Sequence, residues 1–317
     1  MRVFVAGATG AIGTSLVPLL VERGHEVFGT SRSAERAERL RSRGAEPVVL
    51  DLLDPRAVKE AVAAVEPEAI VHQGTGLAGP AEVKHFDRGF ALTNRLRTEG
   101  TDALLEAVRE SGVRRFVAQS YAGWPYARTG GPVKTEEDPL DPDPPAEMRR
   151  SLAAIRHQEE TVTAAGGIAL RYGAFYGLPT DAQLELVRKR QFPIVGDGGA
   201  VWSFVHLEDA AEATVLALER GATGIYNVVD DDPAPVREWL PALAEAIGAK
   251  PPRHVPRWLA RLVAGEAGVS LMTEIRGASN AKAKRELGWT LRHPSWRQGF
   301  RAAYASTREA GRADLAA

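Results

Sequence analysis

Gly7-Ala-Thr-Gly10-Ala-Ile-Gly13 is the stretch of this chain that decides its fold. The apolar run at residues 3–6 comes directly before it and has the length of a buried strand. Residues 12–22 follow, with Ile12, Leu16, Leu19 and Leu20 spaced to lie on one helix face. Glycines at these positions let the chain reverse tightly and let the helix pack close to the strand. The sequence therefore predicts a strand, a tight turn and a helix in immediate succession.

Strand and helix patterns alternate through the first half of the chain. Further strands are expected at residues 26–30, 46–50, 69–72 and 113–119, and helices at 34–43, 55–65 and 96–111. This alternation is typical of right-handed βαβ units, which build a parallel sheet with helices on both faces. We therefore predict an α/β protein with a Rossmann-type, doubly wound parallel sheet.

The regular alternation ends after Ser120. Residues 121–145 are rich in Gly and Pro and predict a loop, followed by a helix at 146–165 and a strand at 168–172. We expect a nucleotide-binding domain over residues 1–175, to which 201–229 returns, with strands at 201–205 and 225–228 in the main sheet. Residues 176–200 and 230–317 are expected to form a smaller substrate lobe.

The glycine turn has the context that a dinucleotide site needs, because it follows a strand and opens a helix. Amide groups at the helix N-terminus then face the pyrophosphate. The expected contacts are Gly7, Thr9, Gly10, Ala11, Ile12 and Gly13.

The end of the second expected strand indicates which nicotinamide dinucleotide is bound. It reads Phe28-Gly-Thr-Ser31-Arg32, without the acid that usually holds the ribose 2′-hydroxyl of NAD. Ser31 and Arg32 therefore favour the 2′-phosphate of NADP over NAD, although Arg32 is alternatively a solvated arginine like Arg36 and Arg39.

Two further strand ends lie in register with the glycine turn. Asp51 and Leu52 are expected beside the adenine, and Gln73, Gly74 and Thr75 beside the nicotinamide ribose. Taken alone, either segment is also compatible with an ordinary turn.

The composition excludes several classes of function. The chain has 317 residues, with 40 Lys and Arg against 41 Asp and Glu, so its near-neutral charge gives no reason to expect nucleic acid or an anionic membrane as a partner. It has no cysteine, which excludes disulfides, thiolate metal sites and a cysteine nucleophile. We predict no metal site, no membrane span, a cytoplasmic location and a monomer or homodimer.

Several motifs, in order along the chain, resemble the extended short-chain dehydrogenase/reductase superfamily, in its epimerase/dehydratase branch. They are the glycine turn, Asp51-Leu52, Gly100-Thr101-Asp-Ala-Leu-Leu-Glu-Ala107, Val113-Arg-Arg-Phe-Val117 with Ser120, Leu170-Arg-Tyr-Gly-Ala-Phe-Tyr-Gly177 and Phe204-Val-His-Leu-Glu-Asp209. The resemblance implies a Ser/Tyr/Lys catalytic team, in which a Lys four residues after the Tyr lowers the pKa of the Tyr. No tyrosine in this chain has a lysine four residues later. The corresponding positions hold Ser151 and Ile155, or Leu152 and Arg156.

Four residues are candidates for the missing chemistry. Ser120 is expected to bind a substrate oxygen, and Tyr121, Tyr126 or His157 to supply a proton. Alternatives are a strand-end hydroxyl for Ser120 and a surface position for His157. Tyr121, Trp124 and Tyr126 are alternatively aromatic residues that anchor a long loop to the surface.

The resemblance extends to binding residues. Arg156, Tyr172, Gly173 and Phe175 are expected to contact the cofactor, and Trp124, Tyr176 and His206 the substrate. Arg156 alternatively pairs with Glu160, and His206 alternatively caps the following helix.

These observations favour an atypical NADP-dependent oxidoreductase that acts on a small to medium carbonyl or alcohol. A sugar-nucleotide epimerase or dehydratase is one alternative. The other is a protein that binds NADP without redox chemistry, as a non-redox enzyme or a regulator.

Overall fold

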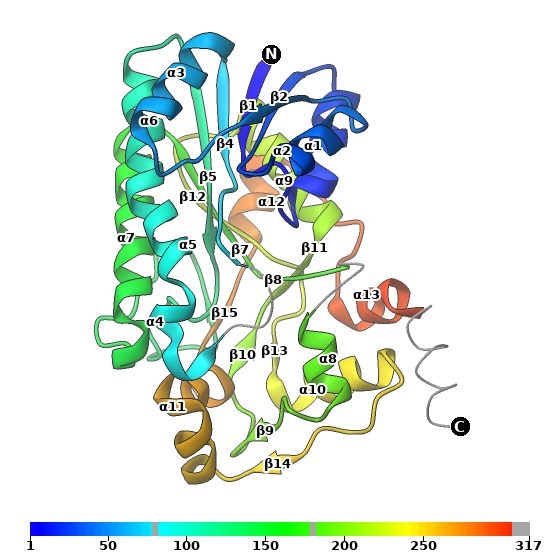
Figure 1. Cartoon of the computed structure of the whole chain (residues 1–317). Coiled ribbons are helices and arrows are strands. Elements are labelled where there is room, and N and C mark those ends of the chain that lie inside the picture. The colour runs from blue at the N-terminus through cyan, green and yellow to red at the C-terminus, as the bar shows by residue number, and fades with distance from the viewer. Residues whose placement is uncertain (78–81, 178–181, 306–317) are drawn as a thin grey trace.

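A seven-stranded parallel sheet forms the centre of the protein in the computed structural model, which describes residues 1–77, 82–177 and 182–305 (Figure 1). The strand order is β12-β7-β5-β4-β1-β2-β3. The strands are β1 (Arg2–Ala6), β2 (Glu26–Ser31), β3 (Glu46–Val49), β4 (Ala69–His72), β5 (Arg115–Tyr121), β7 (Ile168–Tyr172) and β12 (Gly224–Val228). The order reverses direction between β1 and β4, and ligands of such sheets bind at the carboxyl ends beside this point. The predicted Rossmann-type fold is confirmed.

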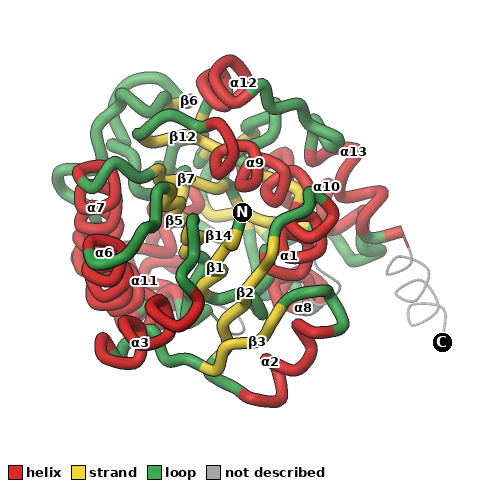
Figure 2. Tube along the Cα trace, turned by 90° about the horizontal axis from the view of Figure 1, so that it is seen from above, coloured by secondary structure: helices red, strands yellow, loops and turns green. Residues whose placement is uncertain are grey.

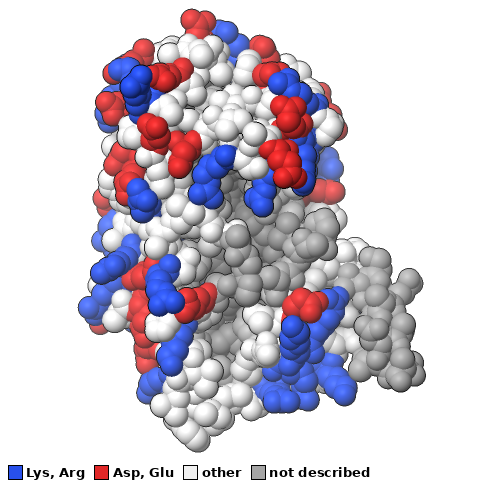
Figure 3. Space-filling view, in the orientation of Figure 1, with Lys and Arg blue, Asp and Glu red and all other residues white. Residues whose placement is uncertain are grey.

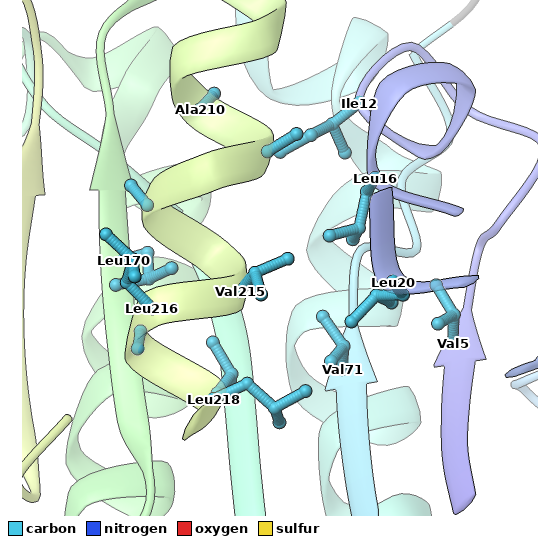
Figure 4. Close-up of a cluster of buried hydrophobic side chains, with 14 of the residues drawn as sticks. Val5, Ile12, Leu16, Leu20, Val71, Leu170, Ala210, Val215, Leu216 and Leu218 are labelled. Atoms are coloured by element: carbon cyan, nitrogen blue, oxygen red, sulfur yellow. The ribbon is translucent and has the colours of Figure 1, made fainter. Parts of the chain in front are cut away.

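Helices cover both faces of the sheet, as the view from above shows (Figure 2). One face carries α1 (Gly13–Glu22), α2 (Ala34–Arg41) and α9 (Leu207–Arg220), and the other carries α3 (Pro55–Val65), α6 (Thr101–Arg109) and α7 (Arg149–Ala164). Alternate residues of β1 enter opposite cores: Val3 and Val5 lie in the core that contains α1 and α9, while Phe4 and Ala6 lie in the core that contains α3 and α6. Figure 4 shows the first core, where Ile12, at the start of α1, and Leu16 and Leu20 of α1 meet α9.

The smaller lobe lies at the carboxyl ends of the strands. Its helices are α4 (Phe86–Gly89), α8 (Ala182–Arg188), α10 (Val236–Ala246), α11 (Arg257–Thr273) and α13 (Trp296–Ala303). Two other helices pack on the larger domain: α5 (Ala91–Arg95) on α7, and α12 (Ala281–Leu287) on α9 and β12. Short strand pairs complete it: β6 (Val133–Lys134) with β15 (Gly277–Ala278), β8 (Ala174–Tyr176) with β11 (Phe204–His206), β9 (Ile194–Val195) with β14 (His254–Val255), and β10 (Val201–Trp202) with β13 (Ala234–Pro235). Trp239, Trp296 and Phe300 are buried in its core.

The segment 201–205 differs from the sequence expectation. Residues 225–228 join the main sheet within β12, but residues 201–205 form β10 and the start of β11, which pair outside it. The physical reason lies at Gly173, where the Ala174 amide donates to the Ser203 carbonyl at 2.9 Å. The chain therefore pairs with 203–206 only after β7 has ended.

The expected helix at 96–111 is divided in two. Leu96–Gly100 form a π-helical turn, and α6 begins at Thr101. None of the helices in the described part of the chain is long and apolar enough to cross a membrane.

Candidate functional site

The glycine turn holds the backbone of β1 against the end of β4. Gly7 has φ +83°, and a Cβ there would lie 2.8 Å from backbone atoms of Gln73 and Gly74. A Cβ on Gly13 would lie 2.0 Å from the Ala8 carbonyl oxygen, so this position also requires glycine. The Gly7 amide donates to Thr30 Oγ1 at 3.0 Å, which ties the turn to β2. Residues 7–13 therefore leave bare backbone at the N-terminus of α1, as a pyrophosphate site requires.

The end of β2 offers a cation. Thr9 Oγ1 donates to Ser31 Oγ at 3.4 Å, so two of the expected cofactor contacts lie together at this edge. Arg32 is exposed and forms no ion pair with any residue that the structure describes, whereas Arg39 pairs with Glu35. The local geometry suits a ligand phosphate. The wider surface in Figure 3 has both charge signs interspersed rather than a basic face.

The ends of β3 and β4 meet beside the glycine turn. Asp51 is exposed and its carboxylate accepts from the Leu53 amide at 3.1 Å. Leu52 is buried and fills the space where Gly74 lacks a side chain, because a Cβ on Gly74 would lie 2.6 Å from Leu52 Cδ1. Thr75 is half-buried beyond them.

Gln73 and Tyr172 connect β4 to β7. Gln73 Nε2 donates to the Tyr172 hydroxyl at 3.1 Å, while Gln73 Oε1 is buried with no partner among the described residues. The Tyr172 hydroxyl also lies 2.7 Å from Thr214 Oγ1 of α9, and burial raises the pKa of this phenol to about 12. Gly173 allows the close approach of Ser203, and Phe175 packs on the Tyr172 ring with centroids 5.4 Å apart. The free Gln73 oxygen leaves an acceptor for a ligand at this point.

The phase of α7 decides which of its residues face the sheet. Ser151, Ile155 and Glu159, four residues apart, are buried. Arg156 is exposed and His157 is half-buried on another face, because each helical residue turns by about 100°. His157 Nε2 lies 2.8 Å from Asp102 Oδ1 of α6.

Arg156 and His157 line a surface groove with residues 141–144. The structure therefore does not bring either residue to the crevice at the strand ends. The expectation of a cofactor contact from Arg156 and of proton transfer by His157 conflicts with this placement.

Ser120 belongs to a buried charge cluster. Its hydroxyl donates to Glu159 Oε1 at 2.6 Å. Arg171 of β7 donates to both oxygens of the same carboxylate, at 2.7 and 2.6 Å. The Ser120 proton is thus held by Glu159, and a direct contact with substrate stays a prediction.

Tyr126 and Trp124 anchor the loop after β5. The Tyr126 side chain is fully buried and donates to Asn227 Oδ1 at 2.6 Å, with the Arg171 guanidinium 4.9 Å from its ring centre. Its hydroxyl proton is engaged by Asn227, so this phenol is a poor candidate for proton donation to a ligand. Trp124 is buried and packs edge-to-face on Phe86 at 5.2 Å. For both residues the structure favours the anchoring alternative.

Tyr121 is the candidate acid that keeps a free hydroxyl. It is the last residue of β5 and is half-buried, and its hydroxyl forms no hydrogen bond with any residue that the structure describes. Burial raises its pKa to about 12, and the positive charge of Arg97 opposes that rise. Tyr121 is therefore a protonated phenol at neutral pH, next to a cation.

Arg97 is a residue that the sequence analysis missed. It lies in the π-helical turn 96–100, is only 4% exposed, and its Nε and Nη1 atoms are buried without a partner among the described residues. Sequence alone does not separate it from the nearby Arg95, which is exposed and pairs with Glu99. The only sequence signal for a buried arginine was its position: Arg97 comes two residues after Arg95, in an expected helix whose inner face is apolar.

The predicted substrate residues Tyr176 and His206 lie together at β8 and β11. Tyr176 is buried against Gly299 and packs edge-to-face on His206 at 5.1 Å. His206 caps α9, since its Nδ1 accepts from the Glu208 amide at 3.3 Å. Among the described residues, His206, Glu208 and His293 form a group whose ligand atoms lie within 4.8 Å of one another, which the prediction of no metal site did not anticipate.

Comparisons with known proteins agree with this geometry. The model of the NAD dependent epimerase/dehydratase family matches residues 3–229. A 3-diazoavenalumate denitrifying reductase from a Streptomyces species is 43% identical over 95% of this chain and 99% of its own length. A 2-alkyl-3-oxoalkanoate reductase from Stenotrophomonas maltophilia is 31% identical over 78% of this chain and 76% of its own. The crystal structure of UDP-glucose 4-epimerase from Thermus thermophilus in complex with NAD is 27% identical, with a TM-score of 0.75 over 98% of this chain and 100% of that one.

Proposed function

Because the chain belongs to the NAD-dependent epimerase/dehydratase family, as its motifs predicted, we propose that it is an NADPH-dependent reductase of a small organic substrate. It is an enzyme of the NAD(P)-dependent oxidoreductase and epimerase type, and the solved relative carries NAD. The choice of NADPH, the reductive direction and the substrate are the proposal. Residues 1–175 with α9 and β12 would hold the cofactor, and the smaller lobe the substrate.

The observation that carries the reductive direction is the inner face of α7. Ser151 and Ile155 are buried there, and neither is an acid or a base. The Ser151 hydroxyl is also engaged, because Asp87 accepts a hydrogen bond from the Ser151 amide at 2.8 Å and from its hydroxyl at 2.6 Å. Oxidation of an alcohol needs a base at the hydroxyl, and these two positions supply none, while the Glu159 carboxylate one turn later is bonded to Ser120 and Arg171. The inner face of α7 therefore does not favour transient oxidation as in an epimerase. Reduction needs only a hydride and a weak acid.

The residues around the glycine turn fit a bound NADPH. Gly7 and Gly13 leave the backbone bare where a Cβ would clash, and the Gln73 oxygen is an acceptor without a partner. Arg32 follows β2, where a 2′-phosphate would lie, and forms no ion pair with a carboxylate in the described part of the chain. These contacts favour NADPH over NADH.

We propose Tyr121 as the catalytic acid for a carbonyl substrate. The reduced nicotinamide, when bound, supplies a hydride to the carbonyl carbon. The electron pair of the carbonyl bond moves to oxygen, and the Tyr121 hydroxyl gives its proton to that oxygen. The Tyr121 oxygen then regains a proton from water. Its pKa of about 12 keeps the phenol in the donor form across the neutral range.

A diazo group is a second candidate for the reacting centre. The 43% identical relative is named as a denitrifying reductase of a diazo compound. When an aryl diazonium group accepts a hydride, the new C–H bond replaces the C–N bond, whose electron pair leaves with N₂. This step needs no proton, which agrees with the lack of an acid or base at Ser151 and Ile155 of α7.

One experiment tests the proposal and separates the two substrates. NADPH oxidation is followed at 340 nm with 4-formylbenzoate and with 4-carboxybenzenediazonium, in parallel with enzyme-free controls. Tyr121→Phe is expected to lower kcat on the aldehyde by roughly 100-fold and to leave the diazonium rate unchanged. Tyr126→Phe is the matched control and should leave both rates unchanged. Tight NADPH binding without turnover of either compound would refute a reductase and favour a non-redox role.

A further inference from the structure

We infer that Arg97 binds the carboxylate of the substrate in the crevice beside Tyr121, so that the enzyme acts on organic acids. This inference rests on the proposed function and names the substrate class of the same site. Its starting point is the position of Arg97, in a turn that follows β4 along the chain and packs against it. The Leu96 carbonyl lies 3.1 Å from His72 Nε2 at the end of β4. Arg97 is therefore held at the carboxyl ends of the strands, where ligands of this fold bind.

The guanidinium has donors to spare. Arg97 is 4% exposed, and both Nε and Nη1 are buried without a hydrogen-bond partner among the described residues. A buried donor without a partner is costly, and such groups in native proteins are nearly always satisfied by protein, water or ligand. The open donors of Arg97 therefore require an oxygen from outside the described residues, of water or of a ligand, and the charge around Arg97 decides between the two.

The surrounding charges leave Arg97 uncompensated. The charge of Glu159 favours the protonated form of Arg97, but both oxygens of that carboxylate are already bonded to Arg171. His72, on the other side, is fully buried, and burial lowers its pKa to about 4, so it is neutral. Two buried arginines thus share one carboxylate, which leaves one positive charge over.

The charge balance selects the class of ligand. A hydroxyl group would satisfy the donors but would leave the positive charge. A carboxylate satisfies both, because its two oxygens match the planar fork of a guanidinium. The neighbouring Tyr121 phenol is neutral and adds a further donor without adding charge.

The backbone around Arg97 supports a functional role. The five residues 96–100 form a π-helical turn between α5 and α6. Such turns are rare, cost helix stability and occur frequently at functional sites. Here the turn places Arg97 inside the protein while the nearby Arg95 stays exposed, paired with Glu99 at 2.7 Å.

The test is equilibrium binding by calorimetry to the full-length protein saturated with NADP⁺, with benzoate and benzamide as probes. Wild type is expected to bind benzoate at least 10-fold more tightly than benzamide, which has the same shape but no charge. Arg97→Met should weaken benzoate binding by roughly 10- to 100-fold, as expected for a charge-assisted contact, and leave benzamide unaffected. Arg97→Lys should retain part of the preference, and Arg95→Met all of it.

Three results would overturn the inference. Equal binding of benzoate and benzamide by wild type would do so without any variant, even if Arg97→Met failed to fold. Weaker NADPH binding in Arg97→Met with unchanged benzoate affinity would assign Arg97 to the cofactor. An equal loss of kcat on 4-formylbenzoate and its methyl ester would assign it to the reacting oxygen. Because benzoate binding needs no turnover, a wild-type enzyme that failed to oxidise NADPH would refute the proposed function and leave this inference standing.

Discussion

Replacing Glu159 with Gln should destabilise the protein severely, although the side chain keeps its shape. The Glu159 carboxylate accepts three hydrogen bonds, at 2.6 Å from Ser120 and at 2.7 and 2.6 Å from Arg171. Its charge also acts on both buried guanidinium groups, those of Arg171 and Arg97. Gln removes that charge and turns an N–H donor toward one of its former partners. Arg171 is then left buried without a charge partner, as Arg97 already is.

The size of the effect follows from the burial. Removing one partner of a buried ion pair costs about 3–5 kcal/mol. At about 2 °C per kcal/mol for a chain of this size, the Tm should fall by roughly 6–10 °C. Replacing both partners with apolar residues, as in Glu159→Met with Arg171→Met, should cost less than Glu159→Gln alone, because no buried charge of the pair is left over.

Thermal unfolding followed by circular dichroism, with urea titration for the free energy of unfolding, measures the change. Glu160→Gln is the matched control, since Glu160 is the exposed neighbour on α7 and should change stability by less than about 0.5 kcal/mol. A loss below about 1 kcal/mol in Glu159→Gln would refute the view that this carboxylate holds the cluster together.

Three further predictions concern the turn, the cofactor and pH. Gly7→Ala should weaken NADPH binding at least 10-fold by fluorescence titration, because a Cβ would meet Gln73 and Gly74; Gly24→Ala, at a similar φ of +77° in open space, should leave binding unchanged. Arg32→Ala should weaken NADPH binding by roughly 10- to 100-fold and leave NADH unchanged, with Arg43→Ala as control; equal loss for both nucleotides would contradict a 2′-phosphate contact. Burial raises the pKa of Asp230 from an ordinary 3.8 to about 8, so the folded state takes up a proton that the unfolded chain has released, and stability should fall as the pH rises from about 4 to 8. Asp230→Asn should flatten that slope in urea titrations at several pH values, and an unchanged slope would assign it to other groups.

The fold could be predicted from the sequence because its signals are local. The turn at 7–13, the proline that opens α3 and the apolar runs of β1 and β4 each fix an element within a few residues of its observed position. The segment 201–205 has the same apolar pattern but pairs in the smaller lobe. Which strand this segment pairs with depends on where β7 ends and on the close approach of Ser203 to Gly173. An apolar strand pattern contains neither piece of information.

The catalytic candidates were harder to predict because they depend on the direction of side chains. Ser120, Tyr121 and Tyr126 lie within seven residues and look equivalent in sequence, yet only Tyr121 has a hydroxyl free of hydrogen bonds to the described residues. On α7, a shift of one residue separates buried Ile155 from exposed Arg156. Arg97 stayed hidden because a π-helical turn changes the phase of its helix.

The position of β12 at the edge of the large sheet has a consequence for how the molecule can be divided. β12 and α9 come after the first pieces of the smaller lobe in the chain, yet β12 pairs with β7 along its whole length and α9 covers α1. A fragment that stops at residue 175 would lack both, so it would expose the backbone edge of β7 and the apolar side of α1 to water. The nucleotide-binding half is therefore not a module that can be excised from the N-terminal sequence. It becomes complete only after most of the chain has been synthesised.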